Sequence, residues 1–399
     1  MVLKDLLLST LRKSSAWSNF VDVLESTQHS GSKFISGDFT SALGQISDYS
    51  TVKTLLINEA TLKVSGSASS DSNIFYIKAL EPLTLCLVAE APSASSIQDC
   101  NIPKLDYKLD DASYAPVQFV LDAHQAIAAW SLDTNSVIRF KSRVESSSFS
   151  SSSYSDTIEN LFKCQFTTTT PSSPRIESGG NLLSLLSPSL REVAPSPCCF
   201  YELFDNQKLT LTTGPYYTGS ILSPYIFYGL FQYSALTSPA FNLTWDNVPD
   251  GAYSNLYNKS SLQTCPHIKG SVVGKKAFQS AFSLTPLSEA KVEGFYEVSY
   301  QSFNACFSGS RLKSLEMSPS VLGPQSYDNL VSDCSDLVRL KVHFTDWNSD
   351  YKSTHYWMTG CSSTGTFICP EALPEERSGD PSQDYEISYI PADWTIERF

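Results

Sequence analysis

The repeated feature of this chain is clearest in residues 303–317, which read Phe303-Asn-Ala-Cys306-Phe307-Ser-Gly-Ser-Arg-Leu312-Lys-Ser-Leu315-Glu-Met317. An aromatic residue is followed by apolar residues three and four positions later, the spacing of one apolar face of a helical turn. After Leu312 the apolar residues Leu315 and Met317 alternate with polar ones, as they do in a strand. The stretch therefore predicts a helical turn, a bend and a short strand.

The same pattern recurs throughout the C-terminal half of the chain. The six units are Phe200, Leu203, Phe204 and Leu209; Phe227, Leu230, Phe231 and Leu236; Tyr253, Leu256, Tyr257 and Leu262; Phe278, Ala281, Phe282 and Leu287; Phe303, Cys306, Phe307 and Leu312; and Tyr327, Leu330, Val331 and Leu337. Successive leucines are 27, 26, 25, 25 and 25 residues apart. Because one unit cannot bury its apolar faces alone, the units must stack on one another. The repeat predicts a solenoid of about six coils, spaced about 4.8 Å apart.

Several units resemble the BspA-like leucine-rich repeats of Bacteroides-group gut bacteria and their crAss-like phages. The segments that carry the resemblance are Val331-Ser-Asp-Cys334-Ser-Asp-Leu337 and Met358-Thr-Gly-Cys361-Ser-Ser, with Phe307-Ser-Gly-Ser-Arg-Leu312 matching without the cysteine. Residues 363–370 and 390–396 are similar to the family's terminal cap, and Gly180 to Leu186 is similar to the lead-in before its first coil. The resemblance implies a leucine-rich-repeat solenoid with a small β-domain ahead of it.

We therefore expect an α+β, β-rich chain with four parts. Residues 1–70 form an N-terminal helical anchoring segment, 71–178 a small β-sandwich-like domain, 179–360 the solenoid and 361–399 its cap. Strands are predicted where the period approaches two, as at Leu83, Leu85 and Leu87. The serine-rich stretch from Ser146 to Ser155 is predicted to be a surface loop.

The N-terminal segment has one amphipathic pattern. Trp17, Phe20, Val21 and Leu24 fall at i, i+3, i+4 and i+7, which places them on one face of a helix. Such a helix could cover its own domain, or it could dock the protein on a larger body. We carry both interpretations, and the second makes these four residues candidate virion-docking residues.

Composition excludes several classes of function. The chain has 28 basic and 41 acidic residues, a net charge of −13, so nucleic acid and anionic membrane surfaces are unfavourable partners. No apolar run of 18 residues occurs, which argues against membrane insertion. The first 20 residues lack the pattern of a secretory signal peptide, so we expect synthesis in a host cytoplasm with reduced, mostly buried cysteines.

Motifs for catalysis, metals or cofactors are weak. Residues 270–275 superficially resemble a phosphate loop, but they have three spacers where the motif needs four. The five histidines are scattered, without an HExxH pair. Cys198 and Cys199 could bind a soft metal, although packing next to Phe200 is the simpler interpretation. We expect no enzyme activity, no cofactor and no metal.

The predicted strands of the coils should present a ladder of outward side chains. With Leu287, Ala290 and Val292 inward, the same offset in each coil exposes Thr264, Glu289, Lys291, Ser314, Glu316, Arg339, Lys341 and His343. This ladder could be a solvated face. It could also be a binding surface, and its alternating charge then suits a protein or a glycan better than a polyanion.

Three functional hypotheses follow. In the first, the chain is a phage virion protein, a homo-oligomeric fibre or decoration subunit of capsid or tail, whose N-terminal segment contacts other virion proteins. Its repeat face would then bind a host surface protein, a glycan or a neighbouring virion protein. In the second it is a bacterial BspA-like surface adhesin for host matrix proteins, and in the third an intracellular scaffold. The apparent lack of a signal peptide favours the virion hypothesis.

Overall fold

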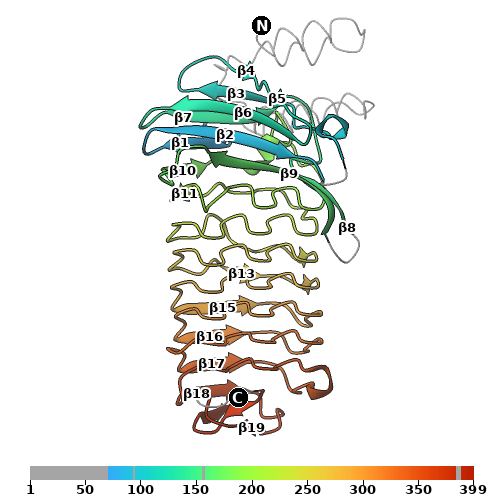
Figure 1. The fold of residues 1–399 in the computed structure, drawn as a ribbon. Coiled ribbons are helices and arrows are strands. Elements are labelled where there is room, and N and C mark those ends of the chain that lie inside the picture. The colour runs from blue at the N-terminus through green and yellow to red at the C-terminus, as the bar shows by residue number, and fades with distance from the viewer. Residues whose placement is uncertain (1–70, 93–94, 155–157, 383–387) are drawn as a thin grey trace, which may run out of the picture. The chain divides into compact units, whose positions relative to one another are not determined.

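The computed structural model describes residues 71–92, 95–154, 158–382 and 388–399. All of them belong to one compact unit, Asp71–Phe399. This unit is β-rich: a β-sandwich is followed by a β-solenoid of about six turns within the described residues (Figure 1). The predicted helix carrying Trp17, Phe20, Val21 and Leu24 lies outside the described residues.

Two mainly antiparallel sheets form the sandwich in the described part of the chain. The first contains β1 (Tyr76–Ala79), β3 (Leu105–Leu109), β4 (Ala115–Pro116), β7 (Val137–Ser142), β10 (Arg175–Gly179) and β11 (Thr210–Leu211). The second contains β2 (Leu83–Glu90), β5 (Val120–Leu121), β6 (Gln125–Leu132), β8 (Ser151–Tyr154) and β9 (Ile158–Thr168). The alternating leucines of β2 are buried, as their period of two predicts.

The sandwich and the solenoid share one continuous core. Phe140 of β7 and Phe166 of β9 meet between the sheets, with ring centroids 5.1 Å apart. On one side β10 pairs in parallel with β11 of the first coil, and on the other the Phe166 N–H donates to the Leu203 carbonyl at 2.8 Å. The sandwich therefore covers the first coil, which would otherwise end in unpaired backbone groups.

A parallel sheet runs the length of the solenoid. Its strands are β13 (Ile268–Lys269), β15 (Glu289–Glu293), β16 (Ser314–Met317), β17 (Arg339–Val342), β18 (Thr366–Cys369) and β21 (Thr395–Arg398). Figure 1 shows them one above another, each coil contributing one strand. A shorter parallel ladder joins β12 (Asn247–Val248) to β14 (Val272–Val273) on another side of the coils.

Two columns of aromatic rings fill the interior. The first consists of Phe200, Phe227, Tyr253, Phe278, Phe303 and Tyr327, and the second of Phe231, Tyr257, Phe282 and Phe307, with neighbouring centroids 4.8 to 6.1 Å apart. The repeated leucines Leu209, Leu236, Leu262, Leu287, Leu312 and Leu337 are buried in the same core. The predicted shared spine is therefore present.

The predicted helical turn of each coil is wrong. Among the described residues every helix is a short 3-10 segment: η1 (Asp71–Asn73), η2 (Ile97–Asp99), η3 (Leu182–Leu185) and η4 (Ser349–Tyr351). In the coil after β14, the Phe278 N–H donates to the Ser302 carbonyl of the next coil, whereas the next N–H, of Gln279, donates back to Lys276. An α-helix would use these N–H groups within itself. The alternation instead ties each coil to its neighbour.

Left-handed backbone at every fourth residue produces this alternation. In the same coil Lys276, Ser280 and Leu284 have φ of 56°, 53° and 57°. The chain consequently buries Ala281 and Phe282 and turns Gln279 and Ser280 outward. Two inward residues in every four give the spacing i, i+3, i+4, which is why the sequence imitates a helix.

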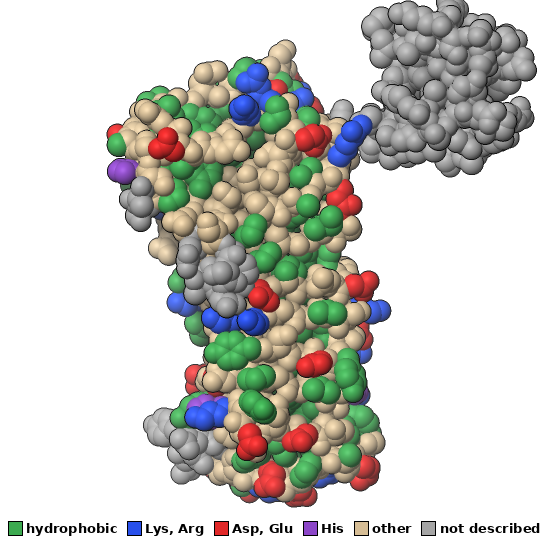
Figure 2. Space-filling model, turned by 90° about the vertical axis from the view of Figure 1, so that its right-hand side faces the viewer, with side chains coloured by type: hydrophobic (Ala, Val, Ile, Leu, Met, Phe, Trp, Pro, Cys, Tyr) green, Lys and Arg blue, Asp and Glu red, His purple; other side chains and the backbone are tan. Residues whose placement is uncertain are grey.

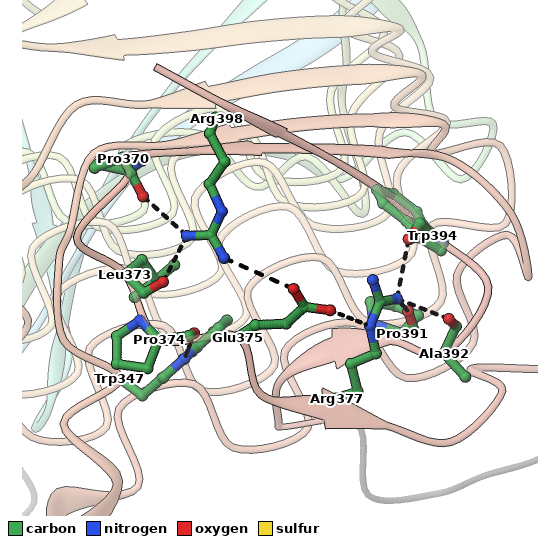
Figure 3. Close-up of polar contacts among 10 residues, drawn as sticks. All are labelled: Trp347, Pro370, Leu373, Pro374, Glu375, Arg377, Pro391, Ala392, Trp394 and Arg398. Atoms are coloured by element: carbon green, nitrogen blue, oxygen red, sulfur yellow. Dashed lines mark hydrogen bonds and ion pairs between the residues drawn. The ribbon is translucent and has the colours of Figure 1, made fainter.

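The C-terminal end of the solenoid is closed by two arginines (Figure 3). Arg398 occupies an inward position of the edge strand β21, and its guanidinium donates to the carbonyls of Pro370 and Leu373. Arg377 of β19 (Arg377–Ser378), which pairs with β20 (Ile390–Pro391), donates to the carbonyls of Pro391, Ala392 and Trp394. Inward charge on an edge strand disfavours the addition of a further coil.

The serine-rich stretch also differs from its prediction as a surface loop. Phe149 is fully buried in the sandwich core, and β8 follows directly. In the described residues, no helix has the length and the apolar character that a bilayer crossing requires.

Candidate functional site

The parallel sheet of the solenoid carries the predicted ladder. Strand register places Glu289, Ser314 and Arg339 side by side, and likewise Lys291, Glu316 and Lys341. The residues between them, such as Leu315 and Leu340, are fully buried. Because side chains alternate across a strand, the two polar columns project from the opposite face. The structure thus brings these six residues together on one surface.

The other two predicted residues lie outside the strands. Thr264 is exposed, but it lies before β13 and has no strand partner among the described residues. The reason is the register, which joins Ile268 to Val292 at a spacing of 24 residues where 25 was assumed. His343 directly follows β17 and points to the same cluster as Lys341.

Ion pairs connect the ladder from strand to strand. The Glu316 carboxylate lies 3.2 Å from Lys341 Nζ, 3.4 Å from His343 Nε2 and 4.0 Å from Lys291 Nζ. Lys291 Nζ is also 2.7 Å from Glu293, whose other oxygen is 2.8 Å from His267 Nε2. Most of the charge on this face is therefore neutralised by neighbouring side chains.

The pKa values follow from these contacts. Partial burial raises the pKa of Glu316, but hydrogen bonds from Lys341 and His343 outweigh it, so the net pKa is lowered. The pKa of Glu293 is lowered by hydrogen bonds from Lys291 and His267. The hydrogen bond to Glu293 and the charge of Glu316 raise the pKa of Lys291. At neutral pH both carboxylates and the lysine are consequently charged.

Sequence reasoning missed three members of this network. Glu293 lies two positions after Lys291 in the same strand, so the period of two could have found it. His267 lies 24 residues before Lys291 and required the true register. Phe399 had no repeat signal, yet its ring centroid is 5.1 Å from both Lys341 Nζ and the His343 ring.

A second polar ladder, also not predicted, lies on the turn side of the coils. Gln279 donates to Asn304 at 3.4 Å, and Asn304 donates to Asp328 at 3.2 Å. His355 Nδ1 is 3.6 Å from the other oxygen of Asp328. Burial raises the pKa of Asp328 despite the nearby histidine. Successive coils thus supply one polar side chain each to a continuous column.

The thiols have the properties of core residues. All ten cysteines are free, and burial raises the pKa of Cys198 to about 11 and of Cys199 to about 12. Their sulfurs are therefore protonated at neutral pH and weakly nucleophilic. Across the described residues, His, Cys, Asp and Glu side chains form no cluster of three or more suited to a metal ion.

Charge is dispersed on the face seen in Figure 2. Acidic and basic side chains are scattered there among hydrophobic and uncharged polar ones, and neither sign gathers into one large patch. This face therefore lacks the basic stripe that binding of nucleic acid requires.

Comparison with known proteins gives no relative. The chain matches no protein-family model, no curated protein and no solved structure. The functional argument therefore rests on the residues themselves.

Proposed function

We propose that this chain is a non-enzymatic structural protein of a phage virion, a fibre or a decoration subunit of the capsid or tail, built on BspA-like leucine-rich repeats. In this proposal residues 1–70, with Trp17, Phe20, Val21 and Leu24, dock on other virion proteins. The repeat domain contacts a host surface protein, a glycan or a neighbouring virion protein. The mature assembly is a homo-oligomer.

The observation that carries the proposal is the register-aligned ladder on the solenoid sheet. Glu289, Ser314 and Arg339 occupy equivalent positions on successive strands, backed by a dry core. A surface held this rigidly loses little conformational entropy when it binds, so it suits an extended partner.

The ion pairs of the ladder support a role in recognition more than in strong electrostatic binding. Glu316 and Glu293 already have cationic partners within the chain. A ligand must exchange these contacts for its own, so charge here contributes specificity and orientation more than affinity.

Mass spectrometry of purified particles tests the proposal. Virions from the source are separated from host envelopes on a density gradient, and peptides from 71–399 are quantified in both fractions, with an abundant host envelope protein as the contamination control. We expect the chain to band with the capsid protein at a constant ratio. Its presence in envelopes and absence from virions would reject the virion assignment and favour the surface adhesin.

A further inference from the structure

Exposed apolar side chains gather along one corner of the coils, away from the ladder of the sheet. They are Val272, Tyr296, Tyr300, Val321 and Tyr351, whose exposed fractions are 59%, 67%, 38%, 39% and 58%. Single exposed apolar residues are ordinary on a protein surface, but a row of them on consecutive coils marks a binding surface.

Backbone hydrogen bonds fix the order of these residues. The N–H groups of Lys276, Gln301 and Gln325 occupy equivalent positions in successive coils and donate to the carbonyls of Tyr300, Pro324 and Tyr351. Tyr300 and Tyr351 are therefore two coils apart, about 9 to 10 Å at the spacing of stacked strands. The Val321 N–H donates to the Tyr296 carbonyl at 3.0 Å, which places these two on adjacent coils.

The phenol groups of Tyr296, Tyr300 and Tyr351 have no hydrogen-bond partner in the described part of the chain. Other tyrosines are tied down: Tyr217 donates to the Ile221 carbonyl at 3.0 Å, and Tyr257 accepts from the Ala240 N–H at 3.1 Å. The three corner tyrosines thus offer both a ring face and a free hydroxyl to a partner.

The charges beside the tyrosines are of both signs. Glu297 and Asp350 are exposed on one hand, and Lys275 and Lys352 on the other. A corner of mixed charge has no field that would select a polyanion or a polycation. It does supply hydrogen-bond donors and acceptors, which suit a ligand rich in hydroxyl groups.

We propose that the corner carrying Tyr296, Tyr300 and Tyr351 binds an extended neutral glycan, with sugar faces stacked on the rings and sugar hydroxyls bonded to the flanking charged groups. The aligned coils present the rings at a spacing comparable to the repeat of an extended sugar chain. This inference deepens the proposed function by naming the ligand class and by moving the glycan contact from the sheet to the corner.

Affinity electrophoresis of the full chain tests the inference. Native gels contain amylopectin, xylan, galactomannan or mixed-linkage β-glucan as neutral probes, and dextran sulfate as the anionic control. We expect at least one neutral probe to retard the wild type. Each of Tyr296→Ala, Tyr300→Ala and Tyr351→Ala should weaken binding roughly two- to tenfold, the worth of one aromatic contact.

Two matched variants separate binding from folding. Tyr233→Ala removes a tyrosine that is 41% exposed in a different column of the coils, and it should leave retardation unchanged. Tyr300→Phe keeps the ring and should retain most of the affinity. Unfolding temperatures of all variants should match the wild type, because the substituted residues are exposed.

The contrary results are distinct. Retardation by none of the four neutral probes, or by dextran sulfate alone, would overturn the inference. So would loss of a virion protein from the alanine variants in a pull-down, without any glycan binding by the wild type, since the corner would then be a protein-docking surface. Glycan binding by a chain absent from virions would leave this inference standing and reject the virion assignment.

Discussion

Phe278 and Phe303 lie 25 residues apart in the chain and stack face to face, with ring centroids 4.8 Å apart and ring planes within 5°. The separation of the rings matches the spacing of neighbouring strands. The repeat length in sequence and the rise of the solenoid are therefore linked through this contact. Each coil gains stability from its neighbours more than from its own hydrogen bonds.

Replacing one ring of this column should weaken the whole stack. Phe303 is fully buried, so Phe303→Ala should lower the free energy of unfolding by about 3 to 5 kcal/mol. Tyr296→Ala, in the neighbouring loop but exposed, should change it by less than about 0.5 kcal/mol. Urea unfolding followed by circular dichroism measures both. Equal effects would mean that the column is not a core.

Two buried tyrosines should prefer to be phenylalanines. The hydroxyls of Tyr253 and Tyr327 are buried and lack a hydrogen-bond partner among the described residues. Tyr253→Phe and Tyr327→Phe should therefore be neutral or stabilising, by up to about 1 kcal/mol.

Tyr257→Phe is the matched control, because it removes the acceptor of the Ala240 N–H bond and should cost about 1 to 2 kcal/mol. Thermal unfolding ranks the three variants. A loss at Tyr253 or Tyr327 as large as that at Tyr257 would show that their hydroxyls are bonded.

The left-handed positions of the turns should accept glycine. Ala305 has a φ of 50°, which costs an L-residue about 1 to 2 kcal/mol, whereas glycine has no such penalty. After the greater chain entropy of unfolded glycine is subtracted, Ala305→Gly should stabilise by about 0.5 to 1 kcal/mol.

Ala281→Gly is the control, since Ala281 is buried outside the left-handed region and the change should destabilise. Chemical denaturation of the two variants distinguishes backbone strain from a general glycine effect. If Ala305→Gly lost as much stability as Ala281→Gly, the backbone assignment of the turns would be wrong.

Acid should weaken the ladder through Glu316. Its folded-state pKa is below the ordinary value of 4.5, so its contribution to stability is present above pH 4.5 and is lost as the pH falls through the folded value. Glu316→Gln should therefore be less stable than wild type near neutral pH, and the difference should shrink in acid.

Glu289→Gln provides the comparison, because Glu289 has no ion-pair partner in the described residues. Its stability should follow that of the wild type at every pH. Urea midpoints at several pH values give the profiles. A Glu316→Gln difference that stayed constant from neutral to acid pH would contradict the ion-pair account.

Much of the solenoid was predictable because it repeats. The constant spacing of leucines fixed which residues share the interior, and the alternation after Leu312 and Leu337 located the strands and their outward columns. For the same reason six of the eight predicted ladder residues lie in register. Thr264 failed because one coil is a residue shorter, and no local signal marks where that residue is lost.

The turns could not be predicted from the pattern alone. Pairs of inward residues every four positions and one face of a helix give the same i, i+3, i+4 spacing, so periodicity cannot separate them. What distinguishes them is the left-handed backbone at residues such as Lys276 and Leu284, which are not glycines. The contact of Phe399 with Lys341 was equally invisible, because it depends on how the chain end folds back.

Disulfide trapping across the coils tests the shared spine most directly. Glu289 and Ser314 are register partners on β15 and β16, about 4.8 Å apart, whereas Glu289 and Arg339 are separated by two coils, about 9.6 Å. Cysteines at 289 and 314, or at 314 and 339, should form a disulfide under mild oxidation, detected by peptide mass spectrometry, and cysteines at 289 and 339 should not. Trapping of 289 with 339 as readily as with 314, or of neither, would contradict the stacked-coil account.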